Sequence, residues 1–540
     1  MSLNPVVRKN TKGIYSIRYK GKELFPDQAV ENRIKSRIQN YQIQNKSLIF
    51  VPSPLLFTGF EHLLSEIGPD NHIFCVEIDQ NLMSLSCEYS SAQFLDSSQI
   101  TYIRTDTKNG ILKTIHGLGP WNFRTVQMLS IGKGYSLFPS QYKEMFSAAS
   151  HFIQQYWQNK MTLIHMGNLW IKNIFRNLEF FRVESALSSI KTGKPVIVAG
   201  AGESLEASLP LIKKNRNKIF LISVDTALSA LTLSGLSPDL VVVMETQLIN
   251  LKDFIGQDLS KTIIVSDLSS HPCIHRLGYR KSLFFLSRFS DSAFISRLKG
   301  LLPGLDIFPA LGSVGVAAVQ CALEITSSSI FLSGLDFSYS LGKSHSRGTP
   351  PHYRTLHSAN RFSGLGNYQS CVQRPLLKVA DKNGEPCITD LILHSYAREL
   401  TNLIYKRENV YDLRAKGLSL GIDNTHRDKD LQRLLKNKPP VHIDNKNISQ
   451  GDHNKIIHFI ENEISIIQRI IKTGKEYIQG KTHGVIPSAL IEDLRTCDYI
   501  YISFPDPPPL PKQEIGFIKR AVISAEWYFT QLGQILSRLG

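Results

Sequence analysis

Two glycine turns in this 540-residue chain carry residue types that suit phosphate binding. The first contains Gly200, Gly202 and Ser204 and follows the apolar segment 196–199. Glycines let a backbone approach a ligand closely, and free N–H groups at a helix start bind phosphate, to which a serine hydroxyl adds a donor. Leu205 takes the third glycine position of a dinucleotide fingerprint, and no Gly-Lys-Ser/Thr follows, so the turn fits neither a dinucleotide site nor a P-loop.

The second turn contains Gly312 and Ser313 and precedes a helix predicted over residues 314–323. That helix is too apolar to lie at a surface, so we expect it in the interior. A buried helix whose N-terminus faces a crevice stabilises an anion well. The second turn therefore predicts a second cluster of N–H donors.

Polar residues follow two of the strands predicted between these turns. Asp225 and Thr226 come directly after residues 218–224, where they are placed to hydrogen-bond a ribose or a base. Asp225 equally suits the N-cap of the next helix. Glu245 follows residues 240–244, and there a carboxylate can orient a sugar, bind a metal or simply be solvated.

A polar, basic loop follows the strand predicted over residues 329–332. Its groups can hold a phosphate or a carboxylate; they are Asp336, Tyr339, Lys343, His345 and Arg347, continued by His352, Arg354 and His357. Ligands of parallel sheets bind beyond the carboxyl ends of the strands, which is where this loop begins. Among the histidines we favour His345 as a functional residue.

The elements that must position these residues alternate along the chain. Short apolar segments predict strands over 196–199, 218–224, 240–244, 262–265, 282–286 and 329–332, and helices are predicted over 204–214, 227–234 and 315–325. Alternating short strands and helices indicate a mostly parallel sheet. We therefore expect a Rossmann-like α/β domain over residues 181–425.

The region before this domain, residues 1–180, also has an α/β pattern. Strands over 48–54 and 72–79 flank a helix over 57–67, which makes a βαβ unit. The unit is similar to the nucleoside-binding half of a methyltransferase, with Glu77 or Asp79 at the ribose carboxylate. The turn after the first of these strands is Pro-Ser-Pro and not glycine-rich, so we favour a domain with a structural role.

The region after it, residues 426–540, is predicted to be a helical domain. It starts with a basic linker over 426–440, and isoleucines then recur at helical spacing at positions 456, 460, 464, 467 and 471. A second helix is predicted over 515–539. The fold class is thus α/β, with a Rossmann-like central domain between an N-terminal α/β domain and a C-terminal helical domain.

The composition of the chain indicates which kinds of binding partner and which cellular compartment to expect. The net charge of +16 suits a polyanion, an acidic sugar nucleotide or a membrane face, but no uninterrupted basic block favours nucleic acid. Seven scattered cysteines without a C-x-x-C pair argue for a reducing compartment and against a zinc site, and we expect no metal. Lacking an apolar leader or a stretch of about 20 apolar residues, the chain is expected to be cytoplasmic, without a membrane span.

Several motifs together resemble the motility accessory factor family, whose core is shared with archaeal 6-hydroxymethylpterin pyrophosphokinases. The matching segments are Gly-Ala-Gly-Glu-Ser-Leu at 200–205, Val-Asp-Thr-Ala-Leu at 224–228, Gly-Leu-Ser-Pro-Asp at 235–239, Gly-Leu-Asp-Phe at 334–337 and Gly-Lys-Ser-His at 342–345. The resemblance covers roughly residues 190–420. Residues 311–315 and 330–337 are also similar to bacterial sialyltransferases that use CMP-sialic acid.

The resemblance implies a protein O-glycosyltransferase. It would move a nonulosonic acid from a CMP donor to serine or threonine hydroxyls of flagellin or another flagellar protein, with no obligatory cofactor. In the sialyltransferases the first turn and the second-strand end contact the nucleotide. The serine turn holds the phosphate side, and a tyrosine near the Asp-Phe pair helps.

The catalytic assignment stays open at this stage. Glu203 stands where the family has proline, which puts a negative charge beside the predicted phosphate site. Thr389 occupies the position of the sialyltransferase base histidine, and His394 is shifted from it. Either His345 or Lys343 would supply a proton or positive charge, and His352, Asp336 or Glu245 would act as base.

Two other functions compete with glycosyl transfer. One is ATP-dependent pterin pyrophosphorylation, which would need magnesium held by acids such as Glu245 and Asp336. The other is a flagellin-binding chaperone or adaptor with a degenerate nucleotide site.

Overall fold

The computed structural model describes residues 4–9, 15–25, 30–89, 94, 96–181, 186–290, 292–302, 304–340, 343–362, 364, 375–422, 441–443, 450–482, 485–505 and 515–539. The chain forms two compact units, Met1–His165 with Pro505–Leu510, and Met166–Phe504 with Pro511–Gly540. Helix α6 (Pro139–Asn177) begins in the first unit and ends in the second. None of the described helices is both long and apolar enough to cross a membrane.

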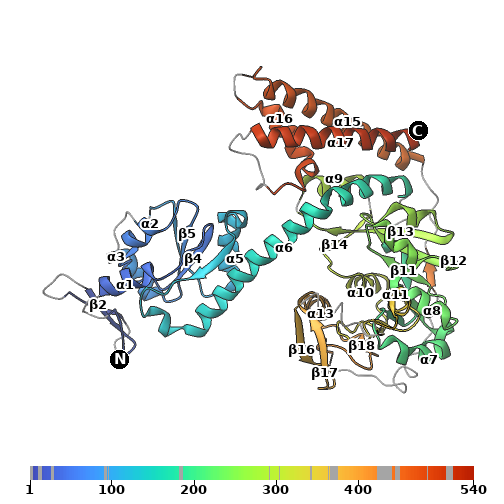
Figure 1. Cartoon of the computed structure of the whole chain (residues 1–540), viewed down its shortest axis with the longest axis horizontal. Coiled ribbons are helices and arrows are strands. Elements are labelled where there is room, and N and C mark those ends of the chain that lie inside the picture. Colours follow the sequence, from blue (N-terminus) through green and yellow to red (C-terminus); the bar gives the residue numbers. More distant parts are fainter. Residues whose placement is uncertain are drawn as a thin grey trace. The chain divides into compact units, whose positions relative to one another are not determined.

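The first unit is built on a parallel sheet of order β6-β5-β4-β7. Its strands are β4 (Ser47–Pro52), β5 (His72–Glu77), β6 (Ile100–Arg104) and β7 (Thr125–Met128). Its helices are α1 (Val30–Gln39), α2 (Phe60–Glu66), α3 (Gln80–Tyr89) and α5 (Lys108–Leu118), drawn in blue in Figure 1. A small antiparallel sheet, β1 (Val6–Lys9), β2 (Tyr15–Tyr19) and β3 (Lys22–Phe25), completes it. The predicted βαβ unit is confirmed.

Glu77, predicted as one of two candidates for a ribose carboxylate, is hydrogen-bonded within the fold. Glu77 is fully buried and accepts hydrogen bonds from Ser53 Oγ at 2.7 Å and Tyr142 Oη at 2.9 Å. Leu55 and Phe57, from the loop after β4, belong to the hydrophobic core. The Glu77 carboxylate and the loop after β4 are thus part of the packed interior of this unit.

The second unit contains an eight-stranded parallel sheet of order β14-β13-β12-β11-β10-β9-β15-β18. The predicted strands are β9 (Val196–Ala199), β10 (Phe220–Val224), β11 (Leu240–Val243), β12 (Leu259–Asp267), β13 (Tyr279–Arg288) and β15 (Ile330–Ser333). Two edge strands were not predicted, β14 (Asp306–Pro309) and β18 (Val410–Asp412). The α/β fold class is confirmed.

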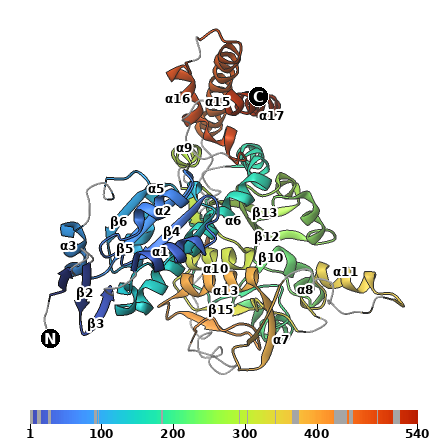
Figure 2. The same ribbon diagram turned by 60° about the vertical axis from the view of Figure 1, so that its left-hand side comes forward.

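Helices follow the strands of this sheet along the chain. They include α7 (Leu205–Asn215), α8 (Leu228–Leu233), α10 (Val314–Ile325), α11 (Pro350–Ser358) and α13 (Leu391–Ile404). Of these, α11 has no buried residue. As predicted, α10 is buried along most of its length, and it packs on β9, β10 and β11 with α13 beside it (Figure 2). A two-stranded sheet of β16 (Leu376–Ala380) and β17 (Pro386–Asp390) precedes α13, and β8 (Ile190–Thr192) pairs with β19 (Val441–Ile443).

The C-terminal helices are α15 (Gln450–Ile478), α16 (Ser488–Thr496) and α17 (Ile515–Leu539), drawn in orange to red in Figure 1. They belong to the same compact unit as the large sheet. Arg297 of α9 (Ala293–Leu301) pairs with the fully buried Glu463 of α15, and its guanidinium also donates to the Thr496 carbonyl. The predicted isoleucine stripe is mainly core, since Ile456, Ile460 and Ile467 are buried.

The last turns of α6 are held to the sheet by two buried amides. Asn173 Nδ2 donates to the carbonyls of Thr246 and Ser269 at 3.1 and 3.0 Å. Asn177 Nδ2 donates to the carbonyls of residues 268 and 270, at 2.8 Å each. These amides fix the loops that leave β11 and β12, the two strands after β10.

Candidate functional site

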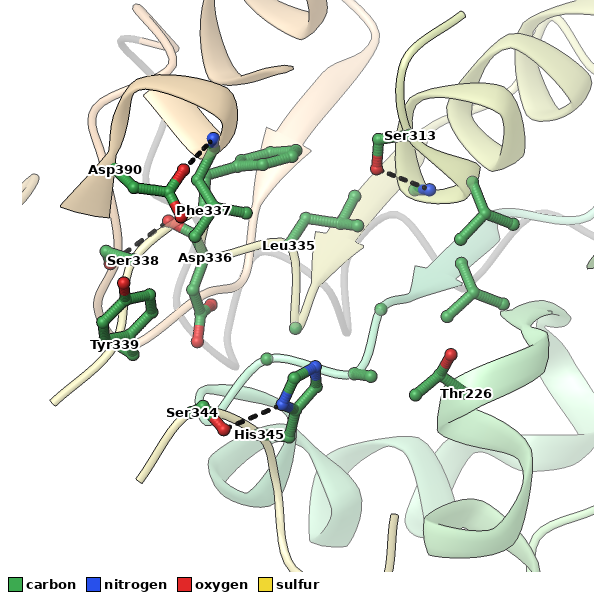
Figure 3. A pocket seen from close by; sticks show the side chains of 18 of the residues that line it. Thr226, Ser313, Leu335, Asp336, Phe337, Ser338, Tyr339, Ser344, His345 and Asp390 are labelled. Atoms are coloured by element: carbon green, nitrogen blue, oxygen red, sulfur yellow. Dashed lines mark hydrogen bonds between the residues drawn. The ribbon is translucent and has the colours of Figure 1, made fainter. Parts of the chain in front are cut away.

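A pocket of about 590 Å³ opens where the chain order of the sheet reverses. Strand β9 lies between β10, which follows it directly in the chain, and β15, which comes more than a hundred residues later. Ligands of open α/β sheets bind at such a switch point, beyond the carboxyl ends of the strands. The pocket is lined by the turns after β9, β10 and β15, the N-terminus of α10, the start of α13, and Ser344 and His345 (Figure 3). Arg354 also lines it.

The predicted site residues divide into two groups. Those that line the pocket are Gly200, Gly202, Thr226, Ser313, Asp336, Tyr339 and His345. Those outside the lining are Ser204, Asp225, Glu245, Gly312, Lys343 and His352. Ser204 and Asp225 are hydrogen-bonded to lining residues, and Gly312 and Lys343 are chain neighbours of lining residues.

The first glycine turn packs directly against the turn that follows β15. The Gly200 and Gly202 N–H groups donate to the carbonyls of Ser333 and Gly334, each at 2.8 Å. A Cβ added at Gly200 would lie 2.3 Å from the Gly334 oxygen, and one at Gly202 would lie 2.7 Å from it. The two glycines are therefore required by contact between two backbones.

Ser204 and Asp336 close the same contact from the side. Asp336 Oδ2 accepts the Ser204 N–H at 2.8 Å, and Oδ1 accepts the Ser204 hydroxyl. Ser204 Oγ in turn accepts the Gly334 N–H at 3.2 Å. Burial raises the pKa of Asp336, although the hydrogen bonds from Ser204 oppose the shift.

These bonds correct the prediction that the first turn offers free N–H groups to a phosphate. The N–H groups of Gly200, Gly202 and Ser204 all have partners within the fold. The sequence could not show this, because their acceptors belong to a segment about 130 residues away. The Ser204 hydroxyl is likewise committed to Asp336.

The second turn keeps its predicted role as a helix start facing the crevice. Ser313 is the N-cap of α10, and its hydroxyl accepts the Gly315 N–H at 3.2 Å. Ser313, Val314 and Gly315 line the pocket, so the positive end of the buried helix faces it. Gly312 packs against a ring, because a Cβ there would lie 2.3 Å from Tyr396 Cε1.

The end of β10 contributes Thr226 to the pocket lining and the buried acid Asp225 beside it. Thr226 lines the pocket, and its N–H and hydroxyl donate to Asp225 Oδ1 at 2.7 and 3.1 Å. Asp225 is 3% exposed, and burial, with a contribution from the charge of Asp253, raises its pKa to about 7. Asp225 is thus the N-terminal acid of a short helical turn, and Thr226 is the residue that a ligand would touch.

Of the six predicted residues outside the lining, Glu245 and His352 form their described contacts with residues that do not line the pocket. Glu245 Oε1 accepts the Gln247 N–H at 3.2 Å, and the Glu245 carbonyl accepts the His271 N–H at 3.0 Å. His352 lies in the first turn of α11, and its ring packs edge-on to Tyr353 at 6.0 Å. His352 Nδ1 is buried without a described partner.

His345 is brought into the pocket as predicted. Its ring borders the cavity, and Nδ1 lies 3.0 Å from the Ser344 hydroxyl (Figure 3). Burial lowers the pKa of His345, and the nearby positive charge of Arg354 lowers it further. A neutral imidazole is a proton acceptor and not the positive charge that was one predicted role for this residue.

The cationic groups around His345 are largely neutralised. Lys343 Nζ lies 2.7 Å from Glu206 Oε1 and 3.6 Å from Glu203 Oε1, while Arg347 Nε lies 2.9 Å from Glu206 Oε2. Lys416 Nζ lies 2.5 Å from Glu203 Oε2. The loop therefore carries less net positive charge toward a ligand than its sequence indicates.

Two charged lining residues, Arg354 and Asp390, were given no individual role from the sequence, which placed Arg354 only in the basic loop. Arg354 of α11 is exposed at the pocket, and no ion pair of 4.0 Å or less ties it to another described residue. Asp390 is the N-cap of α13 and accepts the N–H groups of residues 392 and 393 at 2.9 and 2.8 Å. Thr389 occupies the position of the sialyltransferase base histidine. It is buried, and its hydroxyl donates a hydrogen bond to the Phe337 carbonyl at 2.8 Å, which gives it a structural role.

The sequence carried a weak signal for both residues. Asp390 precedes an apolar helical pattern, which is typical of an N-cap. Arg354 belongs to the basic segment that continues the loop after β15. The sequence did not indicate that α11 and the start of α13 lie at the pocket.

The central part of the chain is similar to a known protein family, and the whole chain is similar to an uncharacterized protein. A family model described as 6-hydroxymethylpterin diphosphokinase MptE-like matches residues 169–342, which contain both turns and most of the sheet. An uncharacterized protein of Treponema pallidum (strain Nichols) is 26% identical over 567 residues, covering 100% of this chain and 96% of that protein. A second uncharacterized protein of the same organism is 26% identical over 137 residues, 25% of this chain and 59% of its own length.

A solved structure has a similar fold over almost the whole chain. It is the MAf glycosyltransferase from Magnetospirillum magneticum AMB-1, with a TM-score of 0.56, 11% identity, and coverage of 98% of this chain and 86% of that one. At such low identity the similarity shows the fold and not the activity.

Proposed function

We propose that this protein is a glycosyltransferase that moves an acidic sugar from a nucleotide donor to a hydroxyl group of a protein. One observation carries the proposal: the pocket at the switch point combines the N-terminus of the buried helix α10, the cation Arg354 and a neutral histidine, His345. The fold is similar to that of a MAf glycosyltransferase, which supports the same class of reaction.

For the donor we propose a CMP-activated nonulosonic acid. Its phosphate and sugar carboxylate are both anionic, which suits α10 and Arg354. We assign Thr226, at the end of β10, to the nucleoside, and Tyr339 is also available because it lines the pocket. The volume of about 590 Å³ is that of a site for a ligand of this size.

The reaction replaces one bond to the anomeric carbon by another. The bond to the phosphate oxygen breaks, and the positive end of α10 and the Arg354 guanidinium stabilise the charge that develops on CMP. The acceptor oxygen attacks the anomeric carbon, and its proton passes to the neutral imidazole of His345. Asp336 has a supporting role in this scheme, because Ser204 engages both of its oxygens.

For the acceptor we propose serine or threonine of flagellin or another flagellar protein. Purified protein should transfer a nonulosonic acid from its CMP donor to flagellin, measured as a mass increase of the acceptor. His345→Gln should lower the rate by about 100-fold or more, the usual contribution of a general base. His357→Gln, at an exposed position in α11, is the matched control and should retain the rate. Full activity of His345→Gln would remove this residue from the mechanism.

A second candidate, pterin pyrophosphorylation, is favoured by the description of the matching family model. That reaction would need carboxylates for magnesium, and Asp336 is committed to Ser204. Among the described residues, no group of three or more His, Cys, Asp or Glu side chains is arranged to hold a metal ion. Asp336, one of the two acids predicted for this role, is therefore already occupied by protein groups.

The third candidate is an adaptor with a degenerate nucleotide site. A thermal-shift comparison with CMP, ATP and a pterin separates the three functions. Stabilisation by CMP alone supports glycosyl transfer, and stabilisation by ATP with the pterin supports pyrophosphorylation. No stabilisation by any of them supports the adaptor.

A further inference from the structure

An acid in the first turn of helix α7, Glu206, binds one residue on each side of His345 in the chain. Glu206 Oε1 accepts hydrogen bonds from Lys343 Nζ at 2.7 Å and from the Arg347 backbone N–H at 2.6 Å. Glu206 Oε2 accepts Arg347 Nε at 2.9 Å. One carboxylate therefore contacts residues two positions before and two positions after the histidine.

A second acid on the same turn extends this arrangement. Glu203 lies 3.6 Å from Lys343 Nζ and 2.5 Å from Lys416 Nζ, and it accepts the Ser340 hydroxyl at 2.8 Å. Burial raises the pKa of Glu203, but the hydrogen bonds from Lys416 and Ser340 outweigh it and the net shift is downward. The acid that replaces the family's proline thus has its charge compensated by protein groups.

The backbone between the two anchored side chains is also attached to the first glycine turn. The Ser346 N–H donates to the Ala201 carbonyl at 2.9 Å, and the Thr349 hydroxyl donates to the Ser346 carbonyl at 2.8 Å. The segment 343–349 is therefore fixed on the loop that connects β9 to α7. His345 borders the pocket from the middle of that segment.

We infer that Glu206, assisted by Glu203, is a positioning residue that holds His345 at the pocket. We call Glu203, Glu206, Lys343 and Arg347 the carboxylate clasp. The inference rests on the proposed function, because the clasp matters for catalysis only if His345 is the general base. Exposed ion pairs generally contribute little. Glu206 differs, because its side chain is only 18% exposed and accepts three charge-assisted or backbone hydrogen bonds in a fixed geometry.

The clasp also determines which cation a ligand meets. Lys343 and Arg347 direct their charge at Glu206, which leaves Arg354 as the basic lining residue without an ion pair among the described residues. Helix α7 thereby sets the position of the histidine and reduces the positive charge of its loop.

The test measures the exposure of His345 directly. Diethyl pyrocarbonate modifies accessible neutral imidazoles, and mass spectrometry gives the rate at each histidine. Buried His275 and exposed His357 serve as internal references. Glu206→Ala should raise the rate at His345 by about tenfold, and Glu206→Gln, which keeps an acceptor oxygen, should give a smaller increase. Asp493→Ala is the matched control: it breaks the 2.7 Å pair with Arg469, and Asp493 is 17% exposed.

Activity provides a second measurement that a merely structural residue would not affect in the same way. In Glu206→Ala the kcat should fall about 10- to 100-fold with little change in the KM for the donor, and Glu206→Asp should recover part of it. If Glu206→Ala fails to fold, Arg347→Met and Lys343→Met break the clasp from the loop side. An unchanged modification rate of His345 in the folded variants overturns the clasp. An increased rate with unchanged transfer supports the clasp and instead removes His345 as the proposed base.

Discussion

Replacing Gly200 by alanine should destabilise the second unit even without any ligand. The added Cβ would lie 2.3 Å from the Gly334 oxygen and 2.6 Å from Leu335 Cδ2, whereas ordinary contact begins at 3.4 Å. The two turns must therefore separate by about 1 Å. Such a movement disrupts the two 2.8 Å hydrogen bonds between them. Two lost hydrogen bonds and the steric overlap together cost about 2–5 kcal/mol.

The assay is urea unfolding of the full chain, with hydrogen exchange in peptides from β9 and β15 to locate the effect. Gly278→Ala is the matched control, because its Cβ would meet nothing within 4 Å and its φ lies outside the left-handed region. The control should stay within about 0.5 kcal/mol of the parent. If Gly200→Ala unfolds like the control, the turns do not approach so closely, and the glycine is retained for a ligand instead.

Three further changes follow from the same contacts. Ser204→Ala removes the hydroxyl shared by Asp336 and the turn after β15, so it should lower the free energy of unfolding by about 2–3 kcal/mol in urea; a loss below 0.5 kcal/mol would contradict that bond. Asp225 has a folded pKa of about 7, above its usual value of 3.8, so its contribution to stability is present at low pH and is lost as pH rises toward 7. Asp225→Asn should therefore be more stable than the parent at pH 8 by a few kcal/mol and by much less at pH 4, and a pH-independent difference in urea unfolding would refute the shift. The pKa of His345 is lowered by burial and by Arg354, so transfer should fall only as the pH drops below about 6.5, and Arg354→Gln should move this acidic limb of the kcat profile to higher pH; an unmoved limb would show that the charge does not act on His345.

The sequence identified most of the large sheet because its strands have strong local signals. Val196–Ala199 and Leu240–Val243 are short runs of buried, mostly β-branched residues between turn residues, and both were predicted within a residue of their bounds. The two missed strands are edge strands, where the signal is weak. Asp306–Pro309 ends in proline and resembles a turn, and Val410–Asp412 has only three residues.

The candidate site was predicted in outline, since parallel strands bring their carboxyl ends to one edge whatever the details. Thr226 and His345 follow from that rule, whereas Ser313 was predicted from the glycine turn that precedes an apolar helix. The state of each group did not follow from it. Whether an N–H is free, or whether Lys343 has an acid beside it, depends on contacts between segments more than a hundred residues apart. No local pattern in the sequence encodes those contacts.

The reversed chain order at the pocket has a consequence for how the protein is made. Ser204 leaves the ribosome well before Gly334, its hydrogen-bonding partner 130 residues later. At about 5–20 residues per second, roughly 7–26 s pass between them. Throughout that time β9 lacks one of its two neighbours, and its exposed edge is open to mispairing with other strands. We expect nascent chains that end before β15 to depend on chaperones.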